Sequence, residues 1–120
     1  MKRNIVLIIL DAVRKDYFDE YAPRLKSLSD VSFSQCRTAS SCSVPSHASI
    51  LTGTLPHQHE IYSTNVDYTE IDVADTFISD ISDYRTIGVS ANTFAGSSFG
   101  FDSHFDVFDD VSWTSRFPNG

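Results

Sequence analysis

Apolar residues follow two periods along this chain. Residues 5–10 are continuously apolar and rich in β-branched side chains, which predicts a strand covered on both faces of a parallel sheet. Residues 31–36 alternate between apolar and polar side chains, and residues 84–89 form a further strand candidate. Residues 72–83 carry apolar side chains at the i, i+3, i+4, i+7 spacing of an amphipathic helix. Beyond residue 92 the pattern assigns little.

Two prolines open further helices. Pro23 begins a short helix that ends near Asp30, and Pro45 begins a helix over residues 46–51 that stops at Gly53. The small polar stretches between these elements are typical of loops. Strands that alternate with helices predict an α/β fold, with a mostly parallel sheet and helices on both faces.

The composition of the chain limits which binding partners are expected. The chain has 120 residues, of which 41% are hydrophobic, enough for one modest domain or part of a larger one. Nine Lys and Arg residues against sixteen Asp and Glu residues give a formal charge of -7. This balance argues against a nucleic-acid partner and an anionic membrane surface. Lysine is scarce and aspartate abundant, which indicates a salt-adapted source.

No segment is long enough to span a membrane. The apolar run at residues 5–10 follows two basic residues but is too short for a secretory signal, and no small-residue cleavage site follows it. The sequence therefore predicts a cytoplasmic protein.

Ser43 is the first candidate for chemistry, because it lies immediately before the helix predicted from Pro45. The N–H groups and positive dipole end of a helix attract anions. A hydroxyl at that point is placed to attack a phosphorus or sulfur centre, if a bound metal lowers its pKa. The alternative is an ordinary helix cap, which is the commoner role of a serine beside a helix start.

Asp11 and Asn92 follow predicted strands. Asp11 stands at the carboxyl end of the first strand, where ligands bind in α/β sheets, and its carboxylate suits Mg, Ca, Mn or Zn. Asn92 follows a later strand and is expected to line the same site. A loop cap at Asp11 and a plain turn at Asn92 are the alternatives. Together, Asp11 and Ser43 would make half of a metal-assisted nucleophile site.

Five ordered segments also resemble a known family, the sulfatases of the alkaline-phosphatase-like superfamily. The segment SVPSHASILTG, which starts at Ser43, resembles the active-site signature in which a Cys or Ser precedes x-P-S-R. The similarity runs from about residue 4 to residue 108. The other resembling segments are NIVLIILD, APRLKSLSDVSF, YRTIGVSAN and FGFDSHFDVF.

This resemblance implies a three-layer α/β sandwich of the alkaline-phosphatase and sulfatase type. Residues 1–120 would be the N-terminal part of one catalytic domain, with the C-terminal remainder absent and little activity in this chain alone. Asp11 matches a metal-binding aspartate, and Ser43 matches the nucleophile, which is also a metal ligand. His47 takes the place of the signature arginine and is a candidate catalytic residue, and the alternative is a partly buried histidine that only packs. No terminal element is predicted at residues 117–120.

The chain also departs from the sulfatase pattern. Ala12 replaces a second aspartate, and Cys42 stands one place too early to be the cysteine that matures to formylglycine. Residues 90–93 lack the Lys and His that hold sulfate in many sulfatases. These departures favour an unmodified Ser43, which is typical of relatives that act on phosphate esters.

The expected function is a metal-dependent hydrolase of sulfate or phosphate esters, either small molecules or carbohydrates. Two alternatives remain from the sequence. One is a phosphoryl transferase of the same superfamily, and the other is a truncated relative without catalysis.

Overall fold

The computed structural model of the protein describes residues 3–112. The chain divides into two compact units, Met1–Arg37 and Thr38–Gly120, and each is described by itself. Residues 117–120, where no terminal element was predicted, lie outside the described residues.

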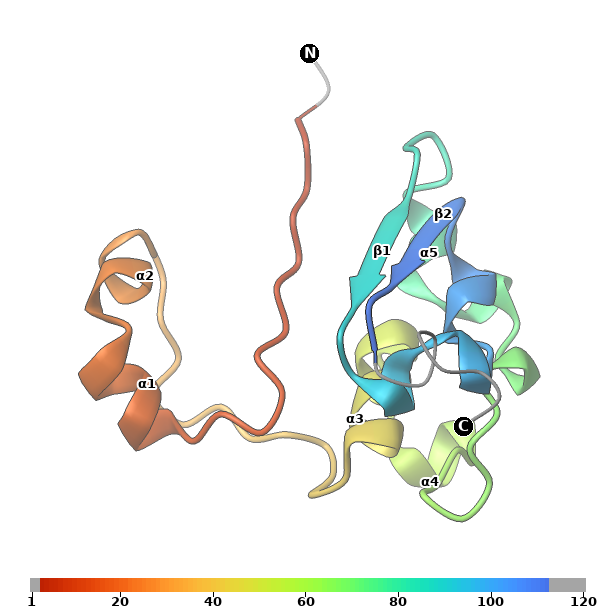
Figure 1. Cartoon of the computed structure of the whole chain (residues 1–120), viewed down its shortest axis with the longest axis horizontal. Coiled ribbons are helices and arrows are strands. Elements are labelled where there is room, and N and C mark those ends of the chain that lie inside the picture. Colours follow the sequence, from red (N-terminus) through yellow and green to blue (C-terminus); the bar gives the residue numbers. More distant parts are fainter. Residues whose placement is uncertain (1–2, 113–120) are drawn as a thin grey trace. The chain divides into compact units, whose positions relative to one another are not determined.

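The first unit contains two short helices, α1 (Lys15–Tyr21) and α2 (Pro23–Ser27), shown at the left of Figure 1. The Asp19 carboxylate accepts hydrogen bonds from Lys15 and, at 3.0 Å, from Lys26. These two lysines lower the pKa of Asp19. None of the described residues from 3 to 37 is buried, so surface ion pairs rather than an apolar core join these helices.

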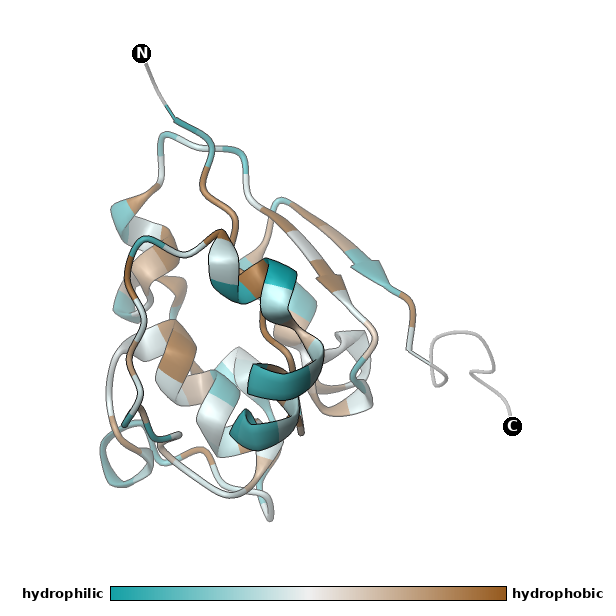
Figure 2. Cartoon of the chain, turned by 90° about the vertical axis from the view of Figure 1, so that its left-hand side faces the viewer, coloured by the Kyte–Doolittle hydropathy of each residue, from teal (hydrophilic) through white to brown (hydrophobic). Residues whose placement is uncertain are grey.

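The predictions of strands at residues 5–10 and 31–36 are wrong for this structure. Neither segment is in a strand, although residues 5–10 run extended (Figure 1). Figure 2 colours this segment hydrophobic, and its side chains are exposed, from 41% at Ile9 to 79% at Val6. A strand needs a hydrogen-bonded neighbour, and the described residues of the first unit provide none for this segment.

The second unit is built around helix α3 (Ser43–Thr52), which is followed by α4 (Pro56–His59) and α5 (Phe77–Asp80). Two strands, β1 (Ile87–Ser90) and β2 (Val107–Asp110), complete it. Short 3₁₀ helices connect these elements: η1 (Tyr68–Glu70), η2 (Val73–Asp75), η3 (Thr93–Ala95), η4 (Ser97–Phe99) and η5 (Phe101–His104).

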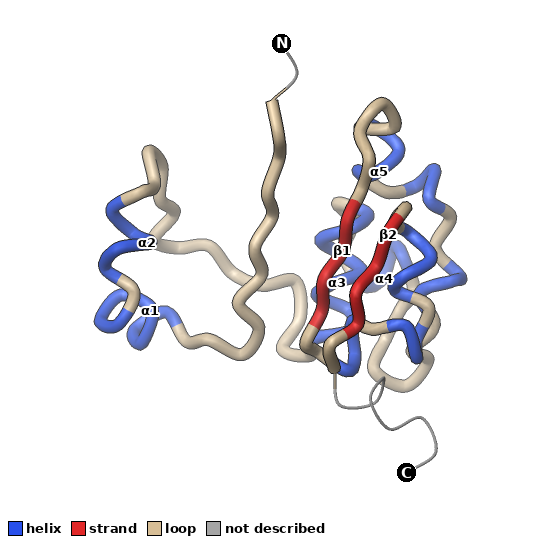
Figure 3. The backbone as a smooth tube through the Cα atoms, turned by 45° about the horizontal axis from the view of Figure 1, so that its top comes forward, coloured by secondary structure: helices blue, strands red, loops and turns tan. Residues whose placement is uncertain are grey.

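Strands β1 and β2 lie side by side and run parallel (Figure 3), with Ile87 opposite Val107 and Ser90 opposite Asp110. Gly88 lies opposite Phe108, and a Cβ atom at Gly88 would come within 2.5 Å of the Phe108 ring. Glycine is therefore required for this close packing. The parallel pair agrees with the predicted α/β class, whereas the described residues contain only these two strands.

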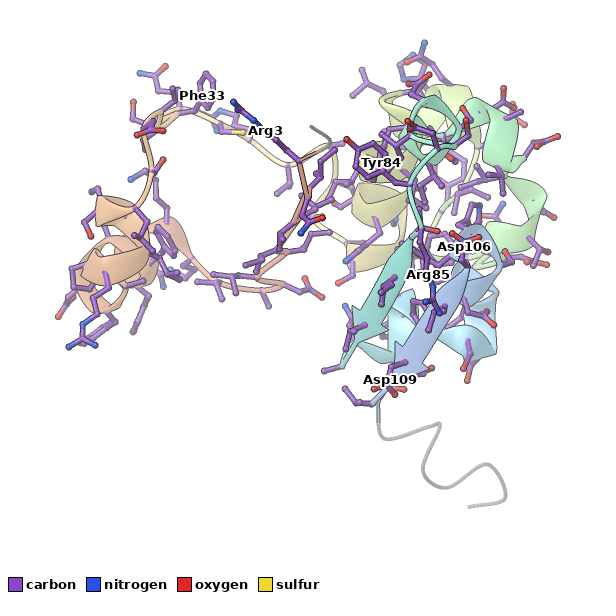
Figure 4. The ribbon with its side chains drawn as sticks, turned by 90° about the horizontal axis from the view of Figure 1, so that it is seen from above. Arg3, Phe33, Tyr84, Arg85, Asp106 and Asp109 are labelled. Atoms are coloured by element: carbon purple, nitrogen blue, oxygen red, sulfur yellow. The ribbon has the colours of Figure 1, made fainter. Side chains whose placement is uncertain are left out.

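Side-chain hydrogen bonds join the two strands at their N-terminal ends. The Asp106 carboxylate accepts hydrogen bonds from the N–H and the hydroxyl of Thr86, at 2.7 and 2.9 Å. In return, the Thr86 hydroxyl accepts from the N–H of Asp106 at 2.9 Å. Figure 4 shows Asp106 beside Arg85 at this point. The hydrogen bonds from Thr86, assisted by the charge of Arg85, lower the pKa of Asp106.

The core of the second unit forms where α3 meets the segments around it. Val44, Ala48 and Leu51 are buried along one face of α3, at the spacing expected of a helix that packs by one stripe. They cluster with residues from other elements. These are Ile61, Tyr68, Ile71, Ile78, Ala95 and Phe101.

The helix predicted over residues 72–83 is interrupted. The structure has η2 and α5 instead, separated by Thr76 in an extended conformation. The buried Thr76 hydroxyl donates to the Val73 carbonyl at 2.7 Å, and Asp72 caps the N–H of Ala74 at 2.9 Å. Short polar side chains that bond the local backbone compete with a continuous helix, which explains the break.

No helix among residues 3–112 combines the length and apolarity that crossing a membrane requires.

Candidate functional site

Helix α3 begins at Ser43, two residues earlier than the sequence predicted. Cys42 occupies the N-cap position in an extended conformation, and Pro45 falls within the first turn. Proline is tolerated there because the N–H groups of the first turn have no acceptor within the helix. Ser43 is therefore the first residue of the helix, and its role as nucleophile stays a prediction.

The loop before α3 is tied to the first turn of the helix. The Ser46 hydroxyl donates to the Ser40 carbonyl at 2.9 Å, and the Ser40 hydroxyl accepts from the N–H of Cys42 at 3.2 Å. Val44 and Pro45 are buried, whereas Ser43 is half-buried at the margin of the core. The core thus anchors the residues next to Ser43 and leaves its side chain partly accessible.

The electrostatics of this helix end suit an anion. No acidic residue lies in the first turn of α3. The partial positive charge at the start of a ten-residue helix is therefore not offset by a carboxylate of its own first turn. A phosphate or sulfate group that reaches Ser43 would meet this positive end.

His47 lies one turn after Ser43 and is 94% buried, with an exposed fraction of 6%. Its Nδ1 is 2.7 Å from the carbonyl oxygen of Ser43. A carbonyl only accepts, so Nδ1 carries the proton and donates it. The ring also packs edge-on against Phe101, at 5.9 Å between centroids. This geometry makes His47 a support of the Ser43 backbone. A direct role in catalysis stays a prediction.

Asn92 lies two residues after the end of β1 and caps η3. Its Oδ1 accepts from the N–H of Phe94 at 2.9 Å, and its own N–H donates to the Ser90 hydroxyl at 3.1 Å. This is the turn role that was the alternative for Asn92, and binding of substrate by its side chain stays a prediction. The segment nevertheless lies near the first turn of α3, because η3 packs against that helix and the Tyr68 hydroxyl is within hydrogen-bonding distance of both the Phe94 and the Val44 carbonyls.

The predicted metal site takes its two proposed ligands from different units of the chain. Asp11 belongs to the first unit and Ser43 to the second, so their pairing at one metal stays a prediction. Within residues 3–112, no three His, Cys, Asp or Glu side chains form a group that could hold a metal ion. Asp11 and Ser43 offer oxygen ligands of the right chemistry, but a divalent ion would require further ligands.

The sequence did not reveal a hydrogen bond between Ser49 and His59, which joins α3 to α4. The Ser49 hydroxyl is 3.0 Å from Nε2 of His59, and Nδ1 of His59 accepts from the N–H of Ile61 at 3.1 Å. Because Nδ1 accepts, the neutral ring carries its proton on Nε2 and donates it toward Ser49. His59 therefore cannot act as a base for Ser49, and the pair is not a nucleophile and base.

Tyr68 is the second feature that the sequence did not reveal. It is fully buried, and its hydroxyl lies 2.9 Å from the Phe94 carbonyl and 3.3 Å from the Val44 carbonyl. One side chain thus connects the residue after Ser43 with the segment after β1. No spacing pattern indicates such a contact, because the residues concerned are far apart in the sequence.

Comparison with known proteins gives one family. The model of the type I phosphodiesterase / nucleotide pyrophosphatase family matches residues 5–87, more than half of the chain. The matched region includes Asp11, Ser43 and His47 and ends before Asn92. No curated protein and no solved structure matched the chain.

Proposed function

Because this chain belongs to the type I phosphodiesterase / nucleotide pyrophosphatase family, we propose that it carries the nucleophile, Ser43, of an enzyme that hydrolyses phosphate esters. The observation that carries the proposal is the position of Ser43 inside the matched region. It is the first residue of a core-anchored helix with no acidic side chain in its first turn. The family also favours a phosphate ester over the sulfate ester that the sequence left open.

The proposed reaction has two steps. The Ser43 oxygen attacks phosphorus, the bond from phosphorus to the leaving oxygen breaks, and the leaving alcohol takes up a proton. Water then cleaves the phosphoserine and releases the phosphate product. The N-terminal end of α3 stabilises the negative oxygens of phosphorus in both steps, because a helix N-terminus favours negative charge.

A divalent ion, when bound, would lower the pKa of the serine hydroxyl. Asp11 is proposed as one of its ligands and Ser43 as another. The further ligands that such an ion requires are not assigned to residues of this chain. His47 is proposed to hold the Ser43 carbonyl, and Asn92 to hold the loop beside it.

We also propose that residues 1–120 form the N-terminal part of one catalytic domain with a three-layer α/β sandwich. Parallel sheets are normally covered on both faces and contain more than two strands. Ile87 and Val89 on β1 are 63% and 68% exposed, so the outer face of this sheet is uncovered by the described residues. A larger sheet with helices on that face would bury them.

The test is hydrolysis of bis(nitrophenyl) phosphate, nitrophenyl phosphate and nitrophenyl sulfate by the natural full-length protein with added Mg, Mn, Ca or Zn. Ser43→Ala is compared with Ser41→Ala, which removes an exposed hydroxyl just before the helix. We expect Ser43→Ala to lower kcat/KM by about a thousandfold or more, the scale of a lost nucleophile. The Ser41→Ala variant should keep wild-type turnover.

Three outcomes would count against this function. Turnover that survives in Ser43→Ala would remove Ser43 as the nucleophile. Faster turnover of the sulfate than of either phosphate ester would indicate that the enzyme is a sulfatase. Turnover that rises with an added alcohol acceptor would instead indicate a phosphoryl transferase.

A further inference from the structure

Tyr68 connects the first turn of α3, which carries Ser43, with η3, the segment that Asn92 caps. Its ring is enclosed in the core with no exposed surface, and it meets Phe101 edge-on at 4.9 Å between centroids. Phe101 in turn meets the ring of His47. The ring of Tyr68 is therefore fixed by packing, and its hydroxyl is delivered to a defined point.

That point lies between two backbone carbonyls from distant parts of the chain. The carbonyl of Val44 belongs to the first turn of α3, directly after Ser43, and lies 3.3 Å from the hydroxyl. The carbonyl of Phe94 belongs to η3, two residues after Asn92, and lies 2.9 Å away. Both carbonyls are acceptors, so the Tyr68 hydroxyl acts as a donor that the two share.

A buried hydrogen-bond donor at this junction restricts the position of the backbone more tightly than apolar packing does. Apolar contacts hold α3 in the core, but they are not directional and allow small rotations and shifts. A hydrogen bond restricts the distance and direction of the atoms that it joins. Because the nucleophile must lie about 3 to 3.5 Å from phosphorus and in line with the leaving oxygen, small shifts of the first turn reduce the rate.

We propose that Tyr68 is a positioning residue for the phosphoester reaction: its hydroxyl fixes the first turn of α3 against the segment after β1 and so orients Ser43. This inference rests on the proposed function of Ser43. It adds a role for a residue whose hydroxyl lies within hydrogen-bonding distance of the backbone next to the nucleophile.

The test is Tyr68→Phe in the natural full-length protein, assayed with bis(nitrophenyl) phosphate at saturating metal. The change removes one oxygen and keeps the ring. We expect kcat to fall about tenfold while KM changes less than twofold, because attack geometry is lost and binding of the ester is not. Circular dichroism melting shows whether the variant is folded at the assay temperature.

Thr76→Val is the matched control. It also deletes a buried hydroxyl that donates to a backbone carbonyl, but its acceptor, Val73, lies in η2. A role in stability alone predicts that both variants melt at lower temperature and keep wild-type kcat. If Tyr68→Phe is folded and has wild-type kcat, the positioning role is wrong even though Ser43→Ala is inactive. Turnover that survives in Ser43→Ala would instead refute the proposed function on which it rests.

A second measurement covers the case in which Tyr68→Phe is unfolded at the assay temperature. The wild type and the variant are then assayed at a series of lower temperatures, down to one at which circular dichroism shows the variant folded. We expect the deficit in kcat to persist there. A deficit that disappears wherever the variant is folded would overturn the inference.

Discussion

Replacement of Asp110 by Asn should destabilise the second unit in a way that depends on pH. The Asp110 carboxylate, at the end of β2, accepts from the N–H and the hydroxyl of Ser97 at 2.8 and 2.7 Å, and from the N–H of Ser112 at 2.9 Å. Partial burial alone would raise the pKa of Asp110, but the hydrogen bonds from Ser112 and Ser97 outweigh it and lower the pKa to about 2. An asparagine has one acceptor oxygen and would turn its NH₂ group toward one of these donors.

The magnitude follows from the pKa. A fall from 3.8 to about 2 corresponds to about 2 kcal/mol of unfolding free energy. The side chain is only partly buried, and solvent screening reduces the expected value to about 1 kcal/mol. Because the pKa is lowered in the folded protein, this stability is present above pH 3.8 and is lost as the pH falls toward 2.

The assay is urea unfolding of the wild-type chain, Asp110→Asn and Asp109→Asn at a series of pH values from 7 down to 2. Asp109 is adjacent and exposed on β2 (Figure 4), so its replacement makes the same change in charge. The unfolding free energy of Asp110→Asn should lie about 1 kcal/mol below that of the wild type at pH 7. That difference should shrink below pH 3.8 and vanish near pH 2. A difference that stays constant to pH 2, or that appears equally in Asp109→Asn, would refute the reasoning.

Two further predictions concern His59 and Asp11. Burial lowers the pKa of His59 from 6.5, despite backbone hydrogen bonds that raise it, so the neutral ring is the folded form. The contribution of His59 to the unfolding free energy should be complete above pH 6.5 and decline as the pH falls below it. Thermal melting between pH 7 and 5 should show this decline in the wild type. It should not show the decline in His59→Asn, because asparagine does not titrate. An equal decline in both proteins would exclude His59 as its source. For the proposed metal site, Asp11→Asn in the full-length protein should weaken divalent-ion binding about tenfold or more by calorimetry, and unchanged affinity would remove Asp11 from the ligand set.

The sequence predicted those elements whose signals are local. Gly53, which ends α3 with a φ of 69°, and Pro45 in the first turn both mark a helix by their own backbone preferences. The strand predicted at residues 84–89 overlaps β1 but begins three residues and ends one residue too early, and β2 was not predicted at all. Short strands depend on a partner, and the register that defines β2 comes from β1 and from the clamp between Thr86 and Asp106.

The candidate site shows the same division. The helix that begins at Ser43 was predicted from the sequence, because proline and a small polar loop mark the start of a helix, while the role of Ser43 as nucleophile stays a prediction. Tyr68 and the contact between Ser49 and His59 were not found, since they arise only when distant segments pack. Asn92 was interpreted as a site residue from its place after a strand, and its cap of η3 depends on a turn that periodicity does not reveal.

The clamp at the start of the sheet has a consequence for how the chain can pack further. Thr86 and Asp106 join β1 and β2 where the strands begin, and the backbone bond from the Val111 N–H to the Ser90 carbonyl joins them where they end. The described residues thus hold the alignment of the strands without help from the exposed side chains of Ile87 and Val89. That face is therefore already shaped before another layer of the domain packs against it.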